Sequence, residues 1–498
     1  MTDTRLPATL DTTAPSLSAA EFLKRRSRRL IFWRDDYYEW VGTHYDYRDD
    51  DEIRKEVRDF CDGAVTEGGG PFKATIKKVA EIRDAIDMQS LVPARFDYDC
   101  RISNGEDSGR TLITCRNGRL ALTSGELLPH DSDWLVTSSL PFDHEPMLTT
   151  STRWLEFLSS LWPDDDGQEG GSISTLQEML GYLLSGSTAM QKIFLLIGPP
   201  RSGKGTIAWV IERLIGKRNY VGMPLANLAQ GFGMQGLVGK TVMVMPDIRS
   251  AHASASSMLV ERLLNISGED SISINRKYKD DWCGVLPARI VILTNNEVPR
   301  LPDSTGVIAT RFVPLKMTES FFGKEDLTLK AKLESELPQI FSWALEGLRR
   351  LTARGHFVVP EMSEIVLDDI RTTAAPHLSF FEEWLIYEPE NPAAYVIKTA
   401  LYDTYRRWCE SGGYHPFNEG QFAQKLRAAF PGLEDCRPRD ENGIPQRCWR
   451  GLRRRLPDER HGHPIPSSER VYTNDNILTN TLFTRQNRGL IHPLIHPG

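Results

Sequence analysis

A glycine-rich loop at residues 198–206 is the feature that most constrains the fold of this chain. It reads Gly-Pro-Pro-Arg-Ser-Gly-Lys-Gly-Thr and follows Ile193–Ile197, a short apolar run typical of a buried parallel strand. After the loop, apolar residues from Ile207 to Leu214 recur at the spacing of one helix face, and a glycine follows. The sequence therefore predicts a strand, a loop and a helix in succession, which is the basic unit of an α/β fold with a parallel sheet.

The spacing of this loop, Gly-x4-Gly-Lys, predicts that it binds the phosphates of a nucleotide. Glycines let backbone amides turn inward around phosphate oxygens, and the start of a helix adds partial positive charge. Lys204 would reach the β- and γ-phosphates. Pro199 and Pro200 have no N–H, so the amides come mainly from the second half of the loop. The predicted nucleotide-binding residues are Gly198, Ser202, Gly203, Lys204, Gly205 and Thr206.

The residue after the lysine departs from the usual pattern. A Ser or Thr that binds Mg²⁺ normally stands there, whereas this chain has Gly205 and then Thr206. Either Thr206 reaches the metal, or it contacts the α-phosphate and water completes the metal site. Nucleoside kinases also use Gly-Lys-Gly-Thr, so the loop alone leaves a kinase open. A chance glycine-rich loop is disfavoured by its place between strand and helix.

A second apolar strand, Thr241–Met245, ends at Pro246 and Asp247. A carboxylate at the carboxyl end of a strand beside the phosphate loop is a suitable Mg²⁺ ligand, although an aspartate that merely ends a strand is the alternative. No second acid follows directly, so the catalytic base is not identified. Three acids downstream are candidates for it: Glu261, Glu269 and Asp270.

Two further polar residues follow the pattern of an ATPase. Asn296 comes after the apolar strand Arg289–Leu293, where an amide can hydrogen-bond the γ-phosphate and the attacking water; asparagines also suit turns. Arg311 precedes the apolar Phe312–Leu315, and an arginine there can neutralise transition-state charge on a neighbouring subunit's ATP. Taken alone, Arg311 fits a surface arginine at a strand edge better.

The order of these motifs resembles the superfamily 3 helicases. Gly-Pro-Pro-Arg-Ser-Gly-Lys-Gly-Thr is followed by Leu-Val-Gly-Lys and Asp-Ile-Arg, then by Ser-Gly-Glu-Asp and Arg-Lys-Tyr-Lys, then by Leu-Thr-Asn-Asn-Glu-Val-Pro and Ala-Thr-Arg-Phe. More closely, it resembles the phage and plasmid primase-helicases related to the poxvirus primase-helicase. The resemblance is strong over 150–350. It is weaker over 30–150, where Asn117-Gly118 and Leu128-Pro129-His130 carry it.

The resemblance implies an AAA+-like ring motor, usually a hexamer, that uses ATP and Mg²⁺ to move along single-stranded DNA. It implies that Lys204 binds the phosphates and that Asp247 binds Mg²⁺. It also implies that Asn296 is the sensor asparagine and that Arg311 is the arginine finger. Gly205 and the single acid at the second strand depart from the pattern. Phage members of this group can read Asp-Ala-Arg at that strand end, which Asp247-Ile248-Arg249 matches closely.

A cationic segment between the last two motifs is the predicted DNA contact. Arg276, Lys277 and Lys279 alternate with Tyr278 and precede Trp282, a composition suited to phosphate neutralisation and base stacking. By itself this segment fits a solvated charged loop better. The resemblance reverses that preference, because this segment matches the family's region leading to the DNA-binding hairpin. In a hexamer, six copies of the segment would line the pore.

The predicted organisation has an N-terminal and a C-terminal domain on either side of the AAA+-like core. The predicted segments are a disordered leader at 1–20, an α+β helicase-associated domain at 21–150, the P-loop ATPase at 151–351, a linker at 352–376, a winged-helix-like domain at 377–460 and a tail without a core at 461–498.

Within the winged-helix-like domain, one helix is predicted over Val396–Trp408, and Asn418 is predicted to cap a second over Glu419–Phe430. Four side chains of the second helix are candidates to face DNA: Gln421, Gln424, Lys425 and Arg427. A role in docking between subunits is the alternative for this domain.

Composition narrows the functional classes. The net charge of −7 over 498 residues argues against a protein that coats DNA with its whole surface. Seven scattered cysteines without a Cys-x-x-Cys pair favour a reducing compartment and disfavour a zinc ribbon. No signal peptide or membrane-length apolar run is seen, so we expect no membrane association and a location in the cytoplasm of a bacterial host.

The region before residue 150 has neither zinc cysteines nor a recognisable set of catalytic acids. We therefore expect no primase activity in this chain, and the sequence leaves open whether a separate primase is a partner. Three functions stay open at this point. They are a DNA helicase for replication of a phage, plasmid or integrated element, a DNA-stimulated ATPase scaffold with an initiator or defence role, and a nucleotide or small-molecule kinase.

Overall fold

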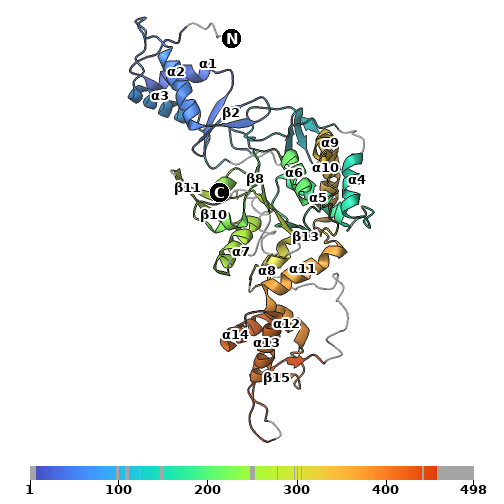
Figure 1. The fold of residues 1–498 in the computed structure, drawn as a ribbon. Coiled ribbons are helices and arrows are strands. Elements are labelled where there is room, and N and C mark those ends of the chain that lie inside the picture. The colour runs from blue at the N-terminus through green and yellow to red at the C-terminus, as the bar shows by residue number, and fades with distance from the viewer. Residues whose placement is uncertain are drawn as a thin grey trace, which may run out of the picture. The chain divides into compact units, whose positions relative to one another are not determined.

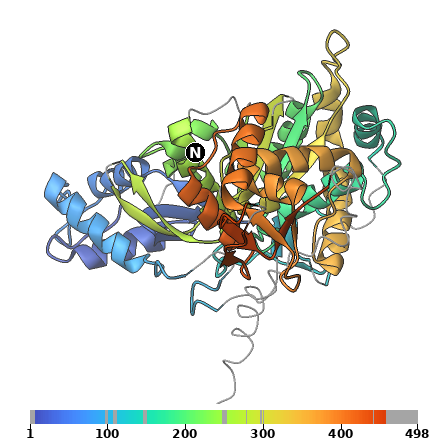
Figure 2. The ribbon, with the colours of Figure 1, turned by 90° about the horizontal axis from the view of Figure 1, so that it is seen from below.

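The computed structural model divides the chain into two compact units, Met1–Ala375 and Pro376–Gly498, which are described separately (Figures 1 and 2). The structure describes residues 7–96, 100–106, 112–122, 124–145, 151–246, 253–277, 279–295, 298–299, 301–303, 305–439 and 442–456. None of the described helices is long and apolar enough to cross a membrane.

The first unit begins with three helices and two small antiparallel sheets. The helices are α1 (Pro15–Arg25), α2 (Asp50–Asp62) and α3 (Ile76–Gln89). The first sheet contains β1 (Leu30–Trp33), β2 (Asp36–Trp40) and β3 (Tyr45–Arg48), and the second contains β4 (Leu112–Cys115), β5 (Gly118–Ala121) and β6 (Leu127–Leu128). The side chain of Asp49 accepts a hydrogen bond from the Asp51 amide, so the acid-rich segment here is a helix start, where negative charge is favourable.

The prediction of a disordered leader over 1–20 is wrong for the residues that the structure describes. Ala8 and Leu10 are buried, and the Leu10 amide donates to the Val65 carbonyl at 2.8 Å. Helix α1 already begins at Pro15. A segment rich in Ser and Thr is ordered here because its backbone pairs with a distant part of the chain.

The centre of the first unit is a five-stranded parallel sheet in the order β13-β7-β12-β9-β8, which confirms the predicted parallel sheet. Its strands are β7 (Ile193–Gly198), β8 (Tyr220–Gly222), β9 (Val242–Met245), β12 (Arg289–Asn295) and β13 (Phe312–Lys316). The helical elements around it are α4 (Thr152–Leu161), α5 (Ser172–Ser185), α6 (Lys204–Ile215), η1 (Leu225–Ala229), η2 (Gln235–Leu237), α7 (Ala253–Gly268), α8 (Val307–Arg311), α9 (Leu329–Ser335) and α10 (Leu337–Arg354). A hairpin of β10 (Ser271–Arg276) and β11 (Lys279–Val285) completes this part.

Both faces of the sheet are buried, as the continuous apolar strands predict. Phe194 and Leu196 of β7 belong to a core shared with α5, α6 and α10. Ile193 and Leu195, which point to the other face, belong to a second core shared with α7 and the segment after α10. The sheet is therefore a fixed middle layer, and its strand ends hold the loops that follow them in place.

The linker predicted over 352–376 is wrong for most of its length. The structure has a helix there, α11 (Glu361–Ala374), with Val366 and Ile370 buried in the second core. The Lys316 amide at the end of β13 donates to the Ser363 hydroxyl at 3.0 Å. Helix α11 thus belongs to the first unit, and the boundary between the units falls after it.

Helices α5 and α10 cross at two glycines. A Cβ at Gly181 would lie 2.4 Å from the Ala344 carbonyl oxygen, and a Cβ at Gly347 would lie 2.5 Å from the backbone of Gln177. Beside this crossing, Glu178 is 2% exposed and pairs with Arg350 at 2.7 Å and with Arg354. The backbones therefore touch, and no larger residue fits at either glycine without separating the helices.

We expect Gly181→Ala to destabilise the first unit by about 1–3 kcal/mol, since overpacking a close contact forces backbone shifts. Urea unfolding followed by circular dichroism would measure the loss. Gly68→Ala is the matched control, because a Cβ at Gly68 meets nothing within 4 Å. Equal midpoints for the two variants would contradict the close approach of α5 and α10.

The second unit packs three helices against short antiparallel strands. The helices are α12 (Pro376–Trp384), α13 (Lys398–Gly412) and α14 (Glu419–Ala429). The strands are β14 (Leu385–Tyr387), β15 (Tyr395–Ile397), β16 (Glu434–Cys436), β17 (Cys448–Arg450) and β18 (Leu452–Arg454), with one sheet in the order β15-β17-β16.

Asn418 caps α14 as predicted, with Gln421 completing a capping box. The helix predicted from Val396 is corrected at its start. Val396 and Ile397 form β15, because they pair with β17, and α13 begins at Lys398. The predicted tail over 461–498 lies outside the described residues.

Candidate functional site

The predicted phosphate loop lies at the carboxyl end of β7, next to the middle of the sheet. Strand β7 ends at Gly198, and α6 begins at Lys204, so the loop joins a buried strand to the first turn of a helix. Neighbours on the two sides of β7 are β13 and β12. In open parallel sheets, ligands bind in the crevice at this edge, where chain connections leave in opposite directions.

Two glycines of the loop are required by their surroundings. Gly203 has a φ of 89°, and a Cβ there would lie 2.7 Å from Leu161 Cδ2. A Cβ at Gly198 would lie 2.8 Å from the Met317 carbonyl oxygen. Arg201 also has a positive φ, 62°, so the loop turns sharply twice before the helix. The two glycines of the Gly-x4-Gly-Lys motif therefore stand at the two loop positions where a side chain would clash with its surroundings.

Lys204 is held over the loop by loop oxygens. Its Nζ donates to the carbonyls of Gly198 and Pro199, each at 2.8 Å, and to the Ser202 hydroxyl at 3.0 Å. The side chain is 8% exposed. Phosphate oxygens are the acceptors that an ammonium in this position can take in place of carbonyls, so the arrangement fits a nucleotide phosphate.

The first turn of α6 has space beside it. A Cβ at Gly205 would meet nothing within 4 Å, and Thr206 is half-buried one residue further on. The first turn of α6 therefore has open space at Gly205, the position where the usual hydroxyl would stand. Within the described part of the chain, no group of three or more His, Cys, Asp or Glu side chains is arranged to hold a metal ion. Asp247, the predicted Mg²⁺ carboxylate, lies outside the described residues.

Strand β12 runs directly beside the loop. Its last residue, Asn295, is in register with Gly198 at the end of β7. Asn296 itself lies outside the described residues. Strand β9, which leads to Asp247, is one strand further away, and its Met245 is in register with Ile292. Because β12 is the direct neighbour of β7, the end of β12 lies closer to the predicted phosphate loop than the end of β9 does.

Arg311 lies at the other end of the strands from the phosphate loop, on the amino-terminal side of the sheet. It precedes Phe312, which is in register with Ile193 at the start of β7. Five residue steps of β7 separate this level from Gly198, which is about 16 Å at roughly 3.3 Å per residue. The guanidinium donates to the side-chain oxygen of Gln191, and burial lowers the pKa of Arg311 while the nearby Asp270 opposes that change. Arg311 and Lys204 of one chain therefore do not share a site.

Two of the three candidate bases gather near Arg311 rather than near Lys204. Glu269 accepts a hydrogen bond from the Thr188 hydroxyl, and Asp270 lies close enough to Arg311 to affect its pKa. Glu261 is exposed on α7. Burial, followed by the charge of Arg311, lowers the pKa of Lys192, whose Nζ donates to the Thr310 carbonyl at 2.7 Å.

The predicted DNA-binding cations lie on and beside the β10–β11 hairpin. Arg276 is buried, with its side chain 7% exposed, and pairs with Asp35 of the N-terminal region at 3.3 Å. Lys277 is exposed at the turn, and its amide donates to the Gln235 side chain. Lys279 starts β11 in register with Arg276.

Asp35 could not be predicted from the sequence as a partner of the hairpin, because 241 positions separate it from Arg276. The alternation of aromatic and charged residues over 33–47 was the signal available in the sequence. It indicates a two-sided strand pair, with one face free to meet another part of the chain.

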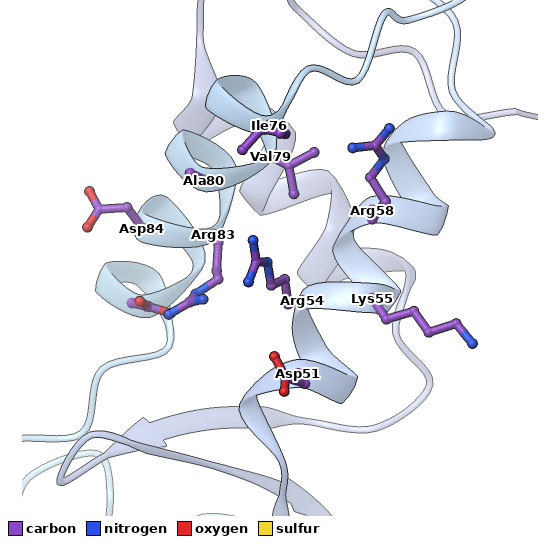
Figure 3. Close-up of a pocket in the computed structure, with 10 residues that line it drawn as sticks. Asp51, Arg54, Lys55, Arg58, Ile76, Val79, Ala80, Arg83 and Asp84 are labelled. Carbon is purple, nitrogen blue, oxygen red and sulfur yellow. The ribbon is translucent and has the colours of Figure 1, made fainter. Parts of the chain in front are cut away.

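A separate cleft of about 630 Å³ lies between α2 and α3 (Figure 3). Arg54 points into it, whereas Lys55 points away. Two of its other arginines are paired, Arg58 with Asp62 at 3.0 Å and Arg83 with Asp50 at 3.2 Å. The cleft is distant in sequence from the phosphate loop and carries mixed charge, so it is a less suitable nucleic-acid site than the hairpin.

Comparison with known families gives three matches along the chain. Residues 20–163 match the family described as D5 N terminal like, residues 196–311 match a family of unknown function (DUF5906), and residues 376–438 match the family described as poxvirus D5 protein-like. A segment of 66 residues is 30% identical to the DNA-binding protein RFX7 of Xenopus laevis. It spans 13% of this chain and only 4% of that protein.

Two solved structures share the fold. The apo structure of the NrS-1 C terminal region has a TM-score of 0.54 and 11% identity, and the match covers 88% of this chain and 99% of that chain. Its A form has a TM-score of 0.52 and 11% identity, with 87% and 98% covered. Two segments of this chain, 20–163 and 376–438, are therefore similar to D5 families, and its fold resembles that of the NrS-1 C terminal region.

Proposed function

We propose that this protein is a superfamily 3 ATP-dependent DNA helicase that works as a hexameric ring on single-stranded DNA during replication of a phage, plasmid or integrated element. The observation that carries the proposal is that Lys204 and Arg311 lie at opposite ends of the strands of one sheet, Lys204 beyond the carboxyl end of β7 and Arg311 at the level of its start. An arginine can stabilise the transferring phosphoryl group only by contact. In this proposal Arg311 therefore acts on the nucleotide of another subunit, because it does not reach the loop of its own chain.

The residues of the loop have distinct roles in this proposal. Lys204 and the amides from Ser202 to Thr206 hold the β- and γ-phosphates of ATP. Asp247 and Thr206 hold Mg²⁺, which would offset charge on the phosphate oxygens, and Asn296 orients the attacking water. Each interface in a closed ring then joins the loop of one chain to Arg311 of the next.

DNA contact is assigned to the hairpin and to the second unit. Lys277 lies exposed at the hairpin turn, and Arg276 helps to fix the hairpin against the N-terminal region. In the second unit, the order of α13, α14, β16 and β17 suits a winged helix, and Arg437 and Arg447 are exposed on the connection between the two strands.

The two alternative functions differ in what supports them. A DNA-stimulated ATPase scaffold would share every feature described so far and differ only in lacking strand separation. A nucleotide or small-molecule kinase would need an acceptor pocket beside the loop and no second subunit. The D5 matches over 20–163 and 376–438 and the position of Arg311 favour the replication enzyme.

Electron microscopy and strand separation together test this proposal. With a slowly hydrolysed ATP analogue and single-stranded DNA, we expect six-fold rings, and with ATP and Mg²⁺ we expect unwinding of a forked duplex. Rings with DNA-stimulated ATPase but no unwinding would favour the scaffold. A protein that remains a monomer under all of these conditions would overturn the ring and favour the kinase.

A further inference from the structure

We propose that the cleft between the β1–β3 sheet and the β10–β11 hairpin binds the bases of single-stranded nucleic acid. This cleft, which we call the sheet–hairpin cleft, has a volume of about 760 Å³. Its lining includes Trp33, Tyr38 and Tyr47 from the sheet, Trp282 from the hairpin, and Lys240, which lies just before β9. The proposal rests on the proposed DNA-dependent function, and it adds a base-binding site in the N-terminal region to the hairpin.

One wall of the sheet–hairpin cleft is aromatic because of the strand alternation. In β2, Tyr37 is buried, so the next residue, Tyr38, points to the opposite face, which is the face of the cleft. The ring centroids of Trp33 and Tyr38 are 5.9 Å apart, and those of Tyr38 and Tyr47 are 6.0 Å apart. Tyr47 is 45% exposed, and Trp282 lines the cleft from the hairpin. Aromatic rings on a sheet face are the usual platform on which unpaired bases stack.

The same cleft is surrounded by positive charge. Its lining includes four cationic side chains and one carboxylate, Asp36; the cations are Arg34, Arg218, Lys240 and Arg276. Arg34 lies over the Trp33 ring at 4.4 Å, which keeps its guanidinium at the aromatic wall. Arg218 and Arg276 pair with Asp46 and Asp35. Arg34 donates to the carbonyls of Ala94 and Phe96, and Lys240 donates to the carbonyl of Arg218, so these two side chains bring positive charge to the wall of the cleft.

Size and chemistry together select the ligand class. A volume of about 760 Å³ falls within the range of roughly 300–1,000 Å³ for sites that hold small organic molecules, so a nucleotide-sized group fits. Stacking does not depend on base identity, which suits a protein that must move along any sequence. A paired duplex does not expose its base faces, so the ligand is a single strand.

The test compares DNA with and without bases. We expect Tyr47→Ala to weaken binding of a fluorescent oligothymidylate about five-fold or more, the loss of one stacked base, while an abasic strand of equal length binds as before. Tyr47→Phe, which keeps the ring, should bind like the wild type. Lys240→Gln should weaken both strands and reduce the log–log salt slope by about 0.7. An equal loss for both strands in Tyr47→Ala would overturn the stacking role.

Photocrosslinking separates this inference from the proposed function. Oligonucleotides carrying iodinated pyrimidines should crosslink to peptides that contain Tyr38 or Tyr47, in DNA and RNA strands alike or in DNA alone. If the wild type unwinds DNA but crosslinks only at Lys277 or within 434–450, the sheet–hairpin cleft is wrong and the helicase stands. If the cleft crosslinks and no unwinding occurs, the cleft stands and the helicase falls. A wild type that binds no single strand overturns both.

Discussion

Replacing Lys204 with alanine is expected to lower ATP hydrolysis by at least about 10²-fold and to leave the fold intact, because a single preorganised cation at a reacting phosphate contributes on that scale. The described partners of the Lys204 ammonium include three oxygens of the loop. In the variant, water can take the place of the ammonium at these loop oxygens, so the fold should persist. A bound nucleotide, by contrast, loses the contact between the ammonium and its phosphates.

Phosphate release with saturating Mg²⁺ and ATP measures this effect, and thermal unfolding checks the fold. Lys217→Ala is the matched control, since Lys217 is exposed just beyond the other end of the same helix. Near-normal turnover by a well-folded Lys204→Ala protein would remove the loop from the mechanism.

Replacing Arg311 with alanine is expected to reduce hydrolysis by about 10³-fold while ATP still binds, if Arg311 acts like other arginine fingers. The binding groups of the loop lie about 16 Å away along β7 and are untouched. A fluorescent ATP analogue measures binding, and phosphate release measures hydrolysis. Gln191→Ala is the control, because it removes the hydrogen-bond partner of Arg311 and keeps the guanidinium. Normal hydrolysis by Arg311→Ala would contradict the proposal.

Mixing two inactive variants gives the sharper form of this experiment. When Arg311→Ala and Lys204→Ala chains assemble together, some interfaces join an intact loop to an intact Arg311, and part of the ATPase activity should return. Unwinding need not return, because it requires several interfaces. No recovery, in mixtures that native mass spectrometry shows to contain both chains, would place Arg311 outside the reaction.

The local pattern of the sequence predicted the centre of the fold well. Apolar strands such as Ile193–Ile197, followed by turn residues, identify a parallel sheet because both of its faces must be buried. The cap at Asn418 was equally visible, since a capping box uses only neighbouring residues.

Features that depend on distant contacts were missed. Residues 7–14 are ordered by backbone pairing with Val65, and α11 by burial of Val366 and Ile370 against the core. The pair Arg276–Asp35 joins two segments that no periodicity links. Because such contacts are set by the topology, the sequence predicted that the hairpin is cationic without showing what faces it.

The rigidity of strand β7 bears on the order in which neighbouring subunits of the proposed ring hydrolyse ATP. The strand is buried along its length, ends in the phosphate loop and is in register at its other end with the strand that follows Arg311. A strand fixed by neighbours on both sides and helices on both faces does not stretch, so its two ends move together. In a closed ring, the state of one nucleotide would then displace the arginine presented to the next. Neighbouring sites are accordingly expected to hydrolyse ATP in succession rather than independently, and the Hill coefficient of the ATPase reports this coupling.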